Sequence, residues 1–141
     1  MKSFSIYLNF DGRTEEAFNF YRSVFGGDLA PMRYKEMPDT SQVSPADREK
    51  ILHGALPHGT TGMILGSDVP ESMRGNLKIG TNTYIMIEAE SEGEAQTLFS
   101  KLSAGGTVEM ALQKTFWGAL YASFSDRFGV QRMINYTYPQ P

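Results

Sequence analysis

The sequence lacks cysteine, and several other residue types and patterns are scarce. Without cysteine the chain can form no disulfide, no thiolate nucleophile and no cysteine-ligated metal site. It contains only two histidines and one tryptophan. Its 13 basic and 16 acidic residues leave a formal net charge of -3, and the basic residues form no cluster. Nucleic acid and anionic membranes therefore have little electrostatic support as partners.

Long apolar runs are absent as well. No stretch approaches the roughly 18 apolar residues that a membrane-spanning helix needs. The N-terminal residues lead directly into a strand pattern, without the apolar core of a signal peptide. We therefore expect a soluble cytoplasmic protein. Hydrophobic residues make up 40% of the 141 residues, enough to bury a core, so we expect one domain over residues 1–141.

The first half of the chain alternates between strand and helix periodicities. Thr14 is a candidate hydroxyl cap for a helix, and Gly26-Gly27 marks its end. Residues 38–50 form a polar loop, with a helical turn after Ser44-Pro45, of the length often found in lids or partner contacts. We place strands at 4–10 and 28–37. A hairpin follows at 51–56 and 62–65, joined across 57–61. The apolar face of the helix consists of Ala17, Phe20, Tyr21, Val24 and Phe25.

The second half repeats this plan after an irregular connection at 68–80. Ser91 and Glu94 fit a capping box, and Gly105-Gly106 ends the helix that they begin. The apolar stripe of this helix is Ala95, Leu98, Phe99 and Leu102. We place strands at 81–88, 107–112, 120–124 and 130–136, with a turn at 126–129 between the last two.

Both halves thus read as strand, helix, two glycines and three strands. The shared plan predicts an α+β fold of two βαβββ modules, the first at about 1–70 and the second at about 78–138. We expect the modules to form one curved, mixed or antiparallel sheet around a cavity, with the helices on its convex face.

Residues 113–118 carry the single tryptophan, next to a phenylalanine and between two strands. Gly118 follows Trp117 directly, which allows the backbone to turn sharply there. Because an exposed Phe116-Trp117 pair is costly in water, we expect it to cover a core or to bind something.

A set of sequence blocks that spans almost the whole chain matches a known pattern: residues 7–12, Glu16-Ala17, Phe20-Tyr21, 25–27, His53, 66–68, 113–118, 126–130 and 133–135. In these blocks the chain resembles the vicinal oxygen chelate superfamily, which includes glyoxalase, bleomycin-resistance proteins and extradiol dioxygenases, and within it the PhnB-like subfamily. Lys114 and Arg132 depart from the pattern, since the subfamily generally has an acid and a tryptophan there.

The resemblance implies paired βαβββ modules, assembled as a homodimer with cavities in or near the interface. Metal-dependent members hold a divalent ion with His, Gln or Glu from four strands, which correspond here to Ser5, His53, Tyr84 and Met133. Because only His53 is a good ligand, we predict no catalytic metal and no cofactor. The subfamily is often described as a methyltransferase, but this sequence does not support that activity. Residues 9–13 lack the glycine-rich fingerprint of a Rossmann cofactor site.

Two function classes remain, and the candidate residues keep two interpretations each. His53 fits a polar anchor or general base in the cavity, or a structural histidine. Phe116 and Trp117 fit a pocket wall or a plug at the sheet end, and Gln113 a ligand contact or a local backbone bond. The first hypothesis is metal-free binding of a small, partly aromatic molecule, and the alternative is a metal-dependent lyase, isomerase or dioxygenase acting on vicinal oxygens. The candidate ligand-binding residues are His53, Tyr84, Gln113, Phe116, Trp117 and Met133.

Overall fold

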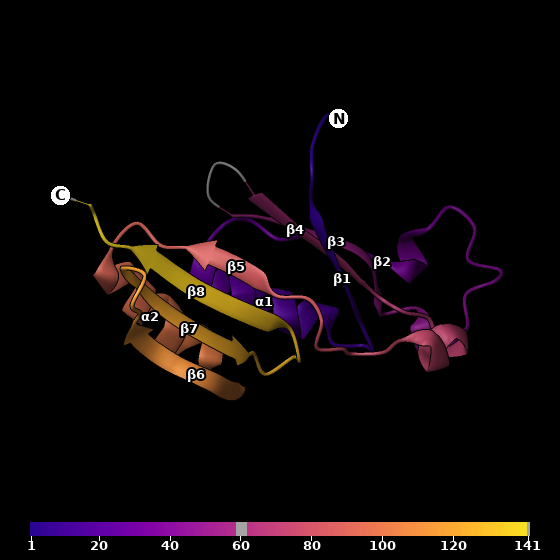
Figure 1. The fold of residues 1–141 in the computed structure, drawn as a ribbon. Coiled ribbons are helices and arrows are strands. Elements are labelled where there is room, and N and C mark those ends of the chain that lie inside the picture. The colour runs from indigo at the N-terminus through magenta and orange to yellow at the C-terminus, as the bar shows by residue number, and fades with distance from the viewer. Residues whose placement is uncertain (59–61, 141) are drawn as a thin grey trace. The chain divides into compact units, whose positions relative to one another are not determined.

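The computed structural model describes residues 1–58 and 62–140, apart from the side chain of His58. Most of the expected hairpin connection at 57–61, and the solvent exposure expected for His58, lie outside the described residues. The chain divides into two compact units, residues 1–78 and 79–141, and each contains one four-stranded sheet (Figure 1). No helix in the described part of the chain is both long and apolar enough to cross a membrane.

Unit 1 is built on a mixed sheet with the strand order β1-β4-β3-β2. β1 pairs in parallel with β4, and the other two pairings are antiparallel. The elements are β1 (Ile6–Phe10), α1 (Thr14–Phe25), β2 (Ala30–Arg33), β3 (Ile51–His58) and β4 (Gly62–Asp68), with the short 3₁₀ helices η1 (Tyr34–Glu36), η2 (Pro45–Asp47) and η3 (Glu71–Asn76).

Unit 2 repeats this topology, with the strand order β5-β8-β7-β6 and a parallel β5–β8 pair. Its elements are β5 (Ile85–Glu88), α2 (Glu92–Ser103), β6 (Thr107–Lys114), β7 (Ala119–Ser125) and β8 (Gln131–Thr137). In both units the first strand pairs with the last in the sheet, and the helix follows the first strand along the chain. This confirms the α+β class and the two βαβββ modules.

The helix of unit 1 buries Ala17 and Tyr21 as predicted, but Phe18 rather than Phe20 completes the buried face. Its buried residues are Thr14, Ala17, Phe18 and Tyr21, whereas Phe20 is half-buried. Phe18 fits because the sheet offers glycines beneath it: a Cβ on Gly66 would lie 2.8 Å from the Phe18 ring. Phe18 was missed because sequence alone does not show which ring faces a glycine.

Thr14 does not cap α1, contrary to the prediction. It is the first helical residue, and both its backbone N–H and its hydroxyl donate to the carboxylate of Asp68, at 2.9 and 2.7 Å. The second carboxylate oxygen of Asp68 accepts from the backbone N–H of Ile51 at 2.8 Å. A buried acid at the end of β4 therefore replaces the local cap and ties α1 to β3.

Several predicted boundaries also differ from the structure. The first strand begins at Ile6 rather than at residue 4, and the strand expected at 28–37 covers only Ala30–Arg33 before η1. The strand expected from residue 81 begins at Ile85, and the connection at 68–80 contains η3. The helical turn expected after Ser44-Pro45 is confirmed as η2.

The helix of unit 2 begins as predicted. The Ser91 hydroxyl accepts a hydrogen bond from the backbone N–H of Glu94 at 3.0 Å, which satisfies one of the free donors of the first turn. Its buried residues are Ala95, Leu98 and Leu102. They pack against β6, β7 and β8, so α2 covers one face of this sheet (Figure 1).

Arg132, one of the two departures from the subfamily pattern, lies on the face of the sheet that α2 covers. Its side chain is 1% exposed, and its Nε lies 3.1 Å from Oδ2 of the buried Asp126. The other oxygen of Asp126 accepts from the backbone N–H groups of Phe128 and Val130. Arg132 is thus a paired interior charge that supports the predicted 126–129 turn.

Candidate functional site

Each sheet has one face covered by the helix of its own unit and one face without a helix. Side chains alternate between the two faces along a strand, and paired residues share a face. Ile134, Ala122 and Phe124 are buried on the α2 side, so their neighbours along β7 and β8 point the other way. We call the other side the helix-free face of each unit.

The helix-free face of unit 2 has a centre of methionines. Met86 on β5 pairs with Met133 on β8, Met133 pairs with Ser123 on β7, and Ser123 pairs with Met110 on β6. Ser123 is only 7% exposed although no helix covers it, so the surrounding longer side chains enclose it. Three flexible thioethers on one surface can adapt to a flat apolar molecule.

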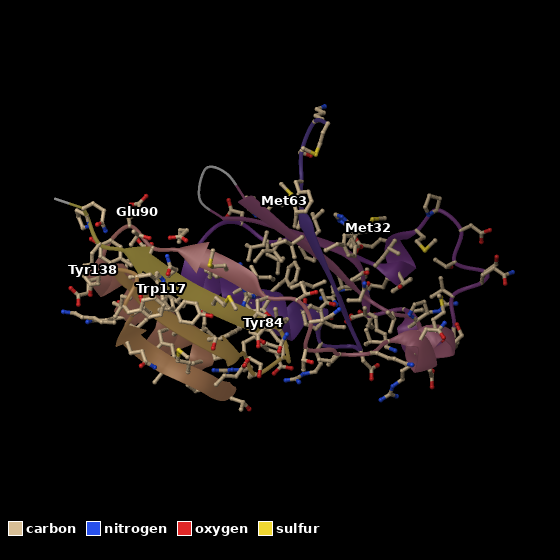
Figure 2. The ribbon with its side chains drawn as sticks, in the orientation of Figure 1. Met32, Met63, Tyr84, Glu90, Trp117 and Tyr138 are labelled. Carbon is tan, nitrogen blue, oxygen red and sulfur yellow. The ribbon has the colours of Figure 1, made fainter. Side chains whose placement is uncertain are left out.

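The turn between β6 and β7 presents the single tryptophan beside this centre. Thr115 closes the turn, since its N–H donates to the carbonyl of Ala119 and its hydroxyl accepts from the Ala119 N–H. Gly118 has φ 85°, a left-handed conformation that permits the sharp turn expected at this glycine. Trp117, labelled in Figure 2, is 55% exposed. Its indole packs edge to face on Tyr121, with ring centroids 6.1 Å apart.

A hydrogen bond crosses the helix-free face from one edge of the sheet to the other. The Tyr84 hydroxyl, just before β5, lies 2.8 Å from both carboxylate oxygens of Glu109 on β6. β5 and β6 are the two edge strands, so these side chains extend over β8 and β7. The hydrogen bond to Glu109 raises the pKa of Tyr84, so the phenol stays neutral and donates.

A second carboxylate lies on the same face. Glu88 is the last residue of β5 and pairs with Asn135 on β8, which in turn pairs with Tyr121. The Asn135 amide donates to both Glu88 oxygens, at 3.1 and 3.0 Å. The Glu88 side chain is exposed, but it is held in position by a neutral partner.

The helix-free face of unit 1 carries a different set of side chains. His53 on β3 is exposed, and its ring centroid lies 6.1 Å from that of Tyr7 on β1. The Tyr7 hydroxyl donates to Ser67 at 3.2 Å, and Ser67 donates to the side-chain oxygen of Asn9 at 3.3 Å. Pairing places Met32 beside His53 and Met63 beside Pro57 on this face.

Of the six predicted ligand-binding residues, the structure brings four together in unit 2: Tyr84, Gln113, Trp117 and Met133 lie on or beside one face. Phe116 lies at the same turn, 97% exposed and edge to face with Trp117. The Gln113 amide donates to the nearby Ala111 carbonyl, the local bond that the sequence left as one option. His53 belongs to unit 1. That these residues bind a ligand stays a prediction.

Sequence reasoning missed other residues of this face, namely Met86, Glu88, Met110, Glu109, Tyr121 and Asn135. Alternation along β5 already put Met86 on the side of Tyr84, and the pairing of β5 with β8 adds Asn135. Glu109 lies where the β6–β7 register shifts, so no period-two pattern could have assigned it to a face.

The donor set does not fit the divalent metal that the fold implies. The duplicated topology makes β4 the counterpart of β8, the strand of Met133, whereas His53 lies on β3. The expected equivalence of His53 to a ligand position therefore stays a prediction that the strand order does not support. The residues that β4 offers on the helix-free face are Met63, Leu65 and Ser67. Across the described residues, no three His, Cys, Asp or Glu side chains lie together in a group that could hold a metal ion.

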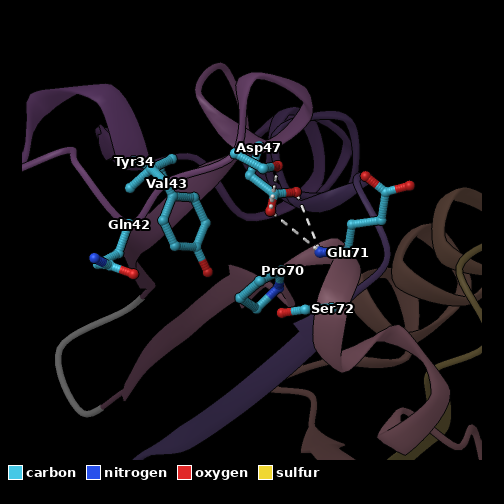
Figure 3. A pocket seen from close by; sticks show the side chains of 8 residues that line it. Tyr34, Gln42, Val43, Asp47, Pro70, Glu71 and Ser72 are labelled. Carbon is cyan, nitrogen blue, oxygen red and sulfur yellow. Dashed lines mark hydrogen bonds between the residues drawn. The ribbon is translucent and has the colours of Figure 1, made fainter.

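The structure also has a cavity of about 490 Å³ in unit 1. Figure 3 shows its walls, which come from the 38–50 loop and the start of η3. Asp47 lies on its wall and accepts from the Glu71 backbone N–H at 3.2 and 3.3 Å and from Lys50 Nζ at 2.9 Å. The residues that line the cavity are Tyr34, Gln42, Val43, Ser44, Asp47, Pro70, Glu71 and Ser72.

The polar groups of this cavity are engaged in holding the loop in place. The hydrogen bond from Lys50 lowers the pKa of Asp47, so the carboxylate stays charged and bound. Burial, with Asp47 and Asp68 nearby, raises the pKa of Tyr34, whose hydroxyl donates to the Asp68 carbonyl at 2.7 Å. We therefore interpret the cavity as a product of the loop anchor rather than as the functional site.

Two βαβββ units, each with one helix packed on a four-stranded sheet that has a single parallel pair, define the fold class of this chain. Residues 6–134 match the model of the Glyoxalase/Bleomycin resistance protein/Dioxygenase superfamily. The chain belongs to this superfamily, which confirms the resemblance seen in its sequence.

Individual relatives agree with this assignment. The chain is 30% identical to protein YjdN of Escherichia coli (strain K12) over 145 residues, covering 97% of each chain. The crystal structure of protein PA1353 from Pseudomonas aeruginosa matches with a TM-score of 0.83 and 31% identity, covering 97% of this chain and 98% of that one. A PhnB protein from Bacillus cereus matches with a TM-score of 0.76 and 21% identity, covering 96% and 100%.

The Bacillus cereus protein is described as a putative 3-demethylubiquinone-9 3-methyltransferase, but its likeness to this chain is one of fold. Here β1 is followed by a turn with the single glycine Gly12, directly before α1. Each sheet has only one parallel pair, whereas a Rossmann cofactor site needs a parallel sheet and a glycine-rich turn. The described residues contain no such methyltransferase site.

Proposed function

We propose that this chain binds a small, partly aromatic molecule through the helix-free faces of its sheets, without a catalytic metal. The observation that carries the proposal is the surface formed by Met86, Met110 and Met133 with Trp117 and Tyr121 at its side. Such a surface is costly in water, at about 25 cal/mol per Å² of apolar area, unless something covers it. Thioether and aromatic groups suit a flat ligand because they give broad contact without a fixed shape.

The polar side chains around this surface would orient the ligand. Asn135, Gln113 and Tyr84 offer donors and acceptors at its border, and His53 offers a ring nitrogen on the helix-free face of unit 1. A few placed polar groups around an apolar surface are typical of small-molecule sites. The alternative, chemistry on vicinal oxygens, requires a metal ligand set that Met63, Leu65 and Ser67 on β4 do not supply.

The proposal is tested with chelator-treated protein and a library of aromatic compounds. Trp117 is the single tryptophan, so its fluorescence reports binding at the β6–β7 turn without labelling. We expect micromolar ligands that quench or shift this emission, and the same affinities after divalent cations are added. Elemental analysis should find well under one transition metal per chain. Stoichiometric zinc, nickel or iron, lost in the His53→Ala variant, would contradict the proposal and favour the metal-dependent enzyme.

We also propose that the chain forms a homodimer. The edge strands β2 and β6 expose apolar residues that a partner copy could cover, among them Met32 at 37% and Val108 at 45% exposure. Light scattering at micromolar concentration should give about twice the chain mass. A mass near 15.7 kDa would contradict the proposal.

A further inference from the structure

The charged side chains of unit 2 are unevenly divided between the two faces of its sheet. Glu88 and Glu109 lie at the helix-free face, where they are held by Asn135 and Tyr84. Both partners are neutral, so neither hydrogen bond brings a positive charge to the carboxylate that accepts it. The ion pairs found among the described residues include neither acid.

The four basic residues of unit 2 all lie elsewhere. Arg132 is buried on the α2 side with Asp126, and Arg127 donates to the carbonyl of Ala104 after α2. Lys101 belongs to the last turn of α2, and the Nζ of Lys114 lies 5.6 Å from the centre of the Tyr138 ring. The Tyr138 hydroxyl in turn reaches Glu92 on α2, which places this group on the helix side.

The aromatic side chains of the helix-free face favour the same sign of charge in a ligand. The faces of Trp117 and Tyr121 carry negative partial charge, and a cation above them is attracted within about 6 Å of the ring centre. Thioether sulfurs are weak acceptors and add no positive charge. The face therefore combines two carboxylates, two aromatic rings and three thioethers with no basic side chain in the described part of unit 2.

We propose that the ligand of this face is a planar aromatic cation. This inference rests on the proposed function and names the class of ligand. The carboxylates Glu88 and Glu109 attract the charge from the border of the surface, and the flat apolar body lies over Met86, Met133 and the Trp117–Tyr121 pair. An anion of the same shape meets two like charges and no compensating cation.

The experiment compares two flat tricyclic probes of opposite charge by isothermal titration calorimetry: proflavine, a cation at neutral pH, and anthracene-9-carboxylate, an anion. We expect proflavine to bind at least tenfold more tightly, with an affinity that falls as salt is added. The double variant Glu88→Gln/Glu109→Gln should lose roughly five- to tenfold in proflavine affinity and little in affinity for the anion. Glu92→Gln on α2 removes one negative charge, half the change made by the double variant, and should leave both affinities unchanged.

The outcomes separate this inference from the proposed function. Equal affinity for both probes, or unchanged proflavine binding by the double variant, contradicts the charge preference while ligand binding stands. No binding of either probe contradicts the proposed function and the inference together. Melting curves of the variants, matched to that of the parent chain, confirm that a loss of affinity reflects the site rather than the fold.

Discussion

The two units share a topology but differ in what their helix-free faces carry. Strand orders β1-β4-β3-β2 and β5-β8-β7-β6 are the same, and each sheet is covered by one helix. In unit 1 the face carries two methionines, a histidine, a tyrosine and a serine–asparagine pair, whereas in unit 2 it carries three methionines, a tryptophan and two carboxylates. Backbone pairing and helix packing thus preserve the duplication, and the uncovered side chains are free to differ.

The interiors of the units differ in the same way. Each has a buried aspartate that joins elements, but Asp68 is satisfied by backbone N–H groups and the Thr14 hydroxyl. Asp126 is satisfied by two N–H groups and by the guanidinium of Arg132. Unit 2 therefore depends on a buried opposite charge, and unit 1 depends on neutral donors.

The largest expected effect comes from breaking that buried pair. Arg132→Ala leaves the Asp126 carboxylate in the interior without its cationic partner, which costs about 3–5 kcal/mol of the free energy of unfolding. Urea denaturation followed by circular dichroism measures the loss. Arg127→Ala is the matched control because Arg127 is exposed and should cost less than about 1 kcal/mol. Equal losses in the two variants would contradict the assigned role of Arg132.

The second-largest effect on the free energy of unfolding is expected at a glycine of unit 1, compared with a glycine of unit 2. In Gly66→Ala the new methyl group would lie 2.8 Å from the Phe18 ring and 2.9 Å from the Leu8 carbonyl, so we expect a loss of about 1–3 kcal/mol. Gly93→Ala in the first turn of α2 meets open space and should stabilise by about 0.5–1 kcal/mol. A neutral Gly66→Ala would show that Phe18 does not depend on this glycine.

A third variant tests whether the two faces serve one ligand, as the sequence predicted for His53 and Trp117. If they do, His53→Ala should weaken the binding free energy of the ligand by about 1 kcal/mol, because one hydrogen-bond partner is lost. Titration of Trp117 fluorescence measures this affinity. Asn19→Ala, on the exposed side of α1, is the control. Unchanged binding by His53→Ala would leave the histidine a structural role and confine the ligand to unit 2.

The smallest expected effect concerns the loop anchor of unit 1. The hydrogen bond from Lys50 lowers the pKa of Asp47, and Asp47 raises the pKa of Lys50. The stability from Asp47 is therefore present above its ordinary pKa of about 3.9 and is lost as pH falls through the lowered value. The difference between the parent chain and Asp47→Asn should be under about 1 kcal/mol at pH 6 and shrink towards pH 2. A difference that grows in acid would contradict this assignment.

Much of the fold was predictable because its signals are local. The Ser91 cap, the turn at 126–129 and the left-handed Gly118 each follow from residues within a few positions of one another. The start of α1 was not, since the group that satisfies Thr14 is Asp68, 54 positions away. The buried position of Phe18 likewise depends on Gly54 and Gly66, which only the folded sheet brings beneath it.

Part of the candidate site was predictable because its signals are also local, and the rest depends on distant partners. Trp117, Tyr84 and Met133 stood out by residue type and strand position. Glu109 did not, because a register shift in β6 and a partner across the whole sheet decide where its carboxylate lies. The family resemblance placed His53 on one of the strands that carry metal ligands. In the structure His53 lies on β3, whereas the strand that corresponds to β8 is β4.

The eight methionines allow the most direct test of ligand binding on the helix-free faces. Pairing assigns Met32 and Met63 to the face of unit 1 and Met86, Met110 and Met133 to that of unit 2, while Met1, Met37 and Met73 lie outside both. Methyl-labelled, chelator-treated protein is titrated with a ligand found through Trp117 fluorescence and followed by NMR. We expect the methyl signals of Met86, Met110 and Met133 to shift most and those of Met1, Met37 and Met73 to stay in place. Shifts confined to the latter group, or shifts that appear only after a divalent metal is added, would contradict metal-free binding at this surface.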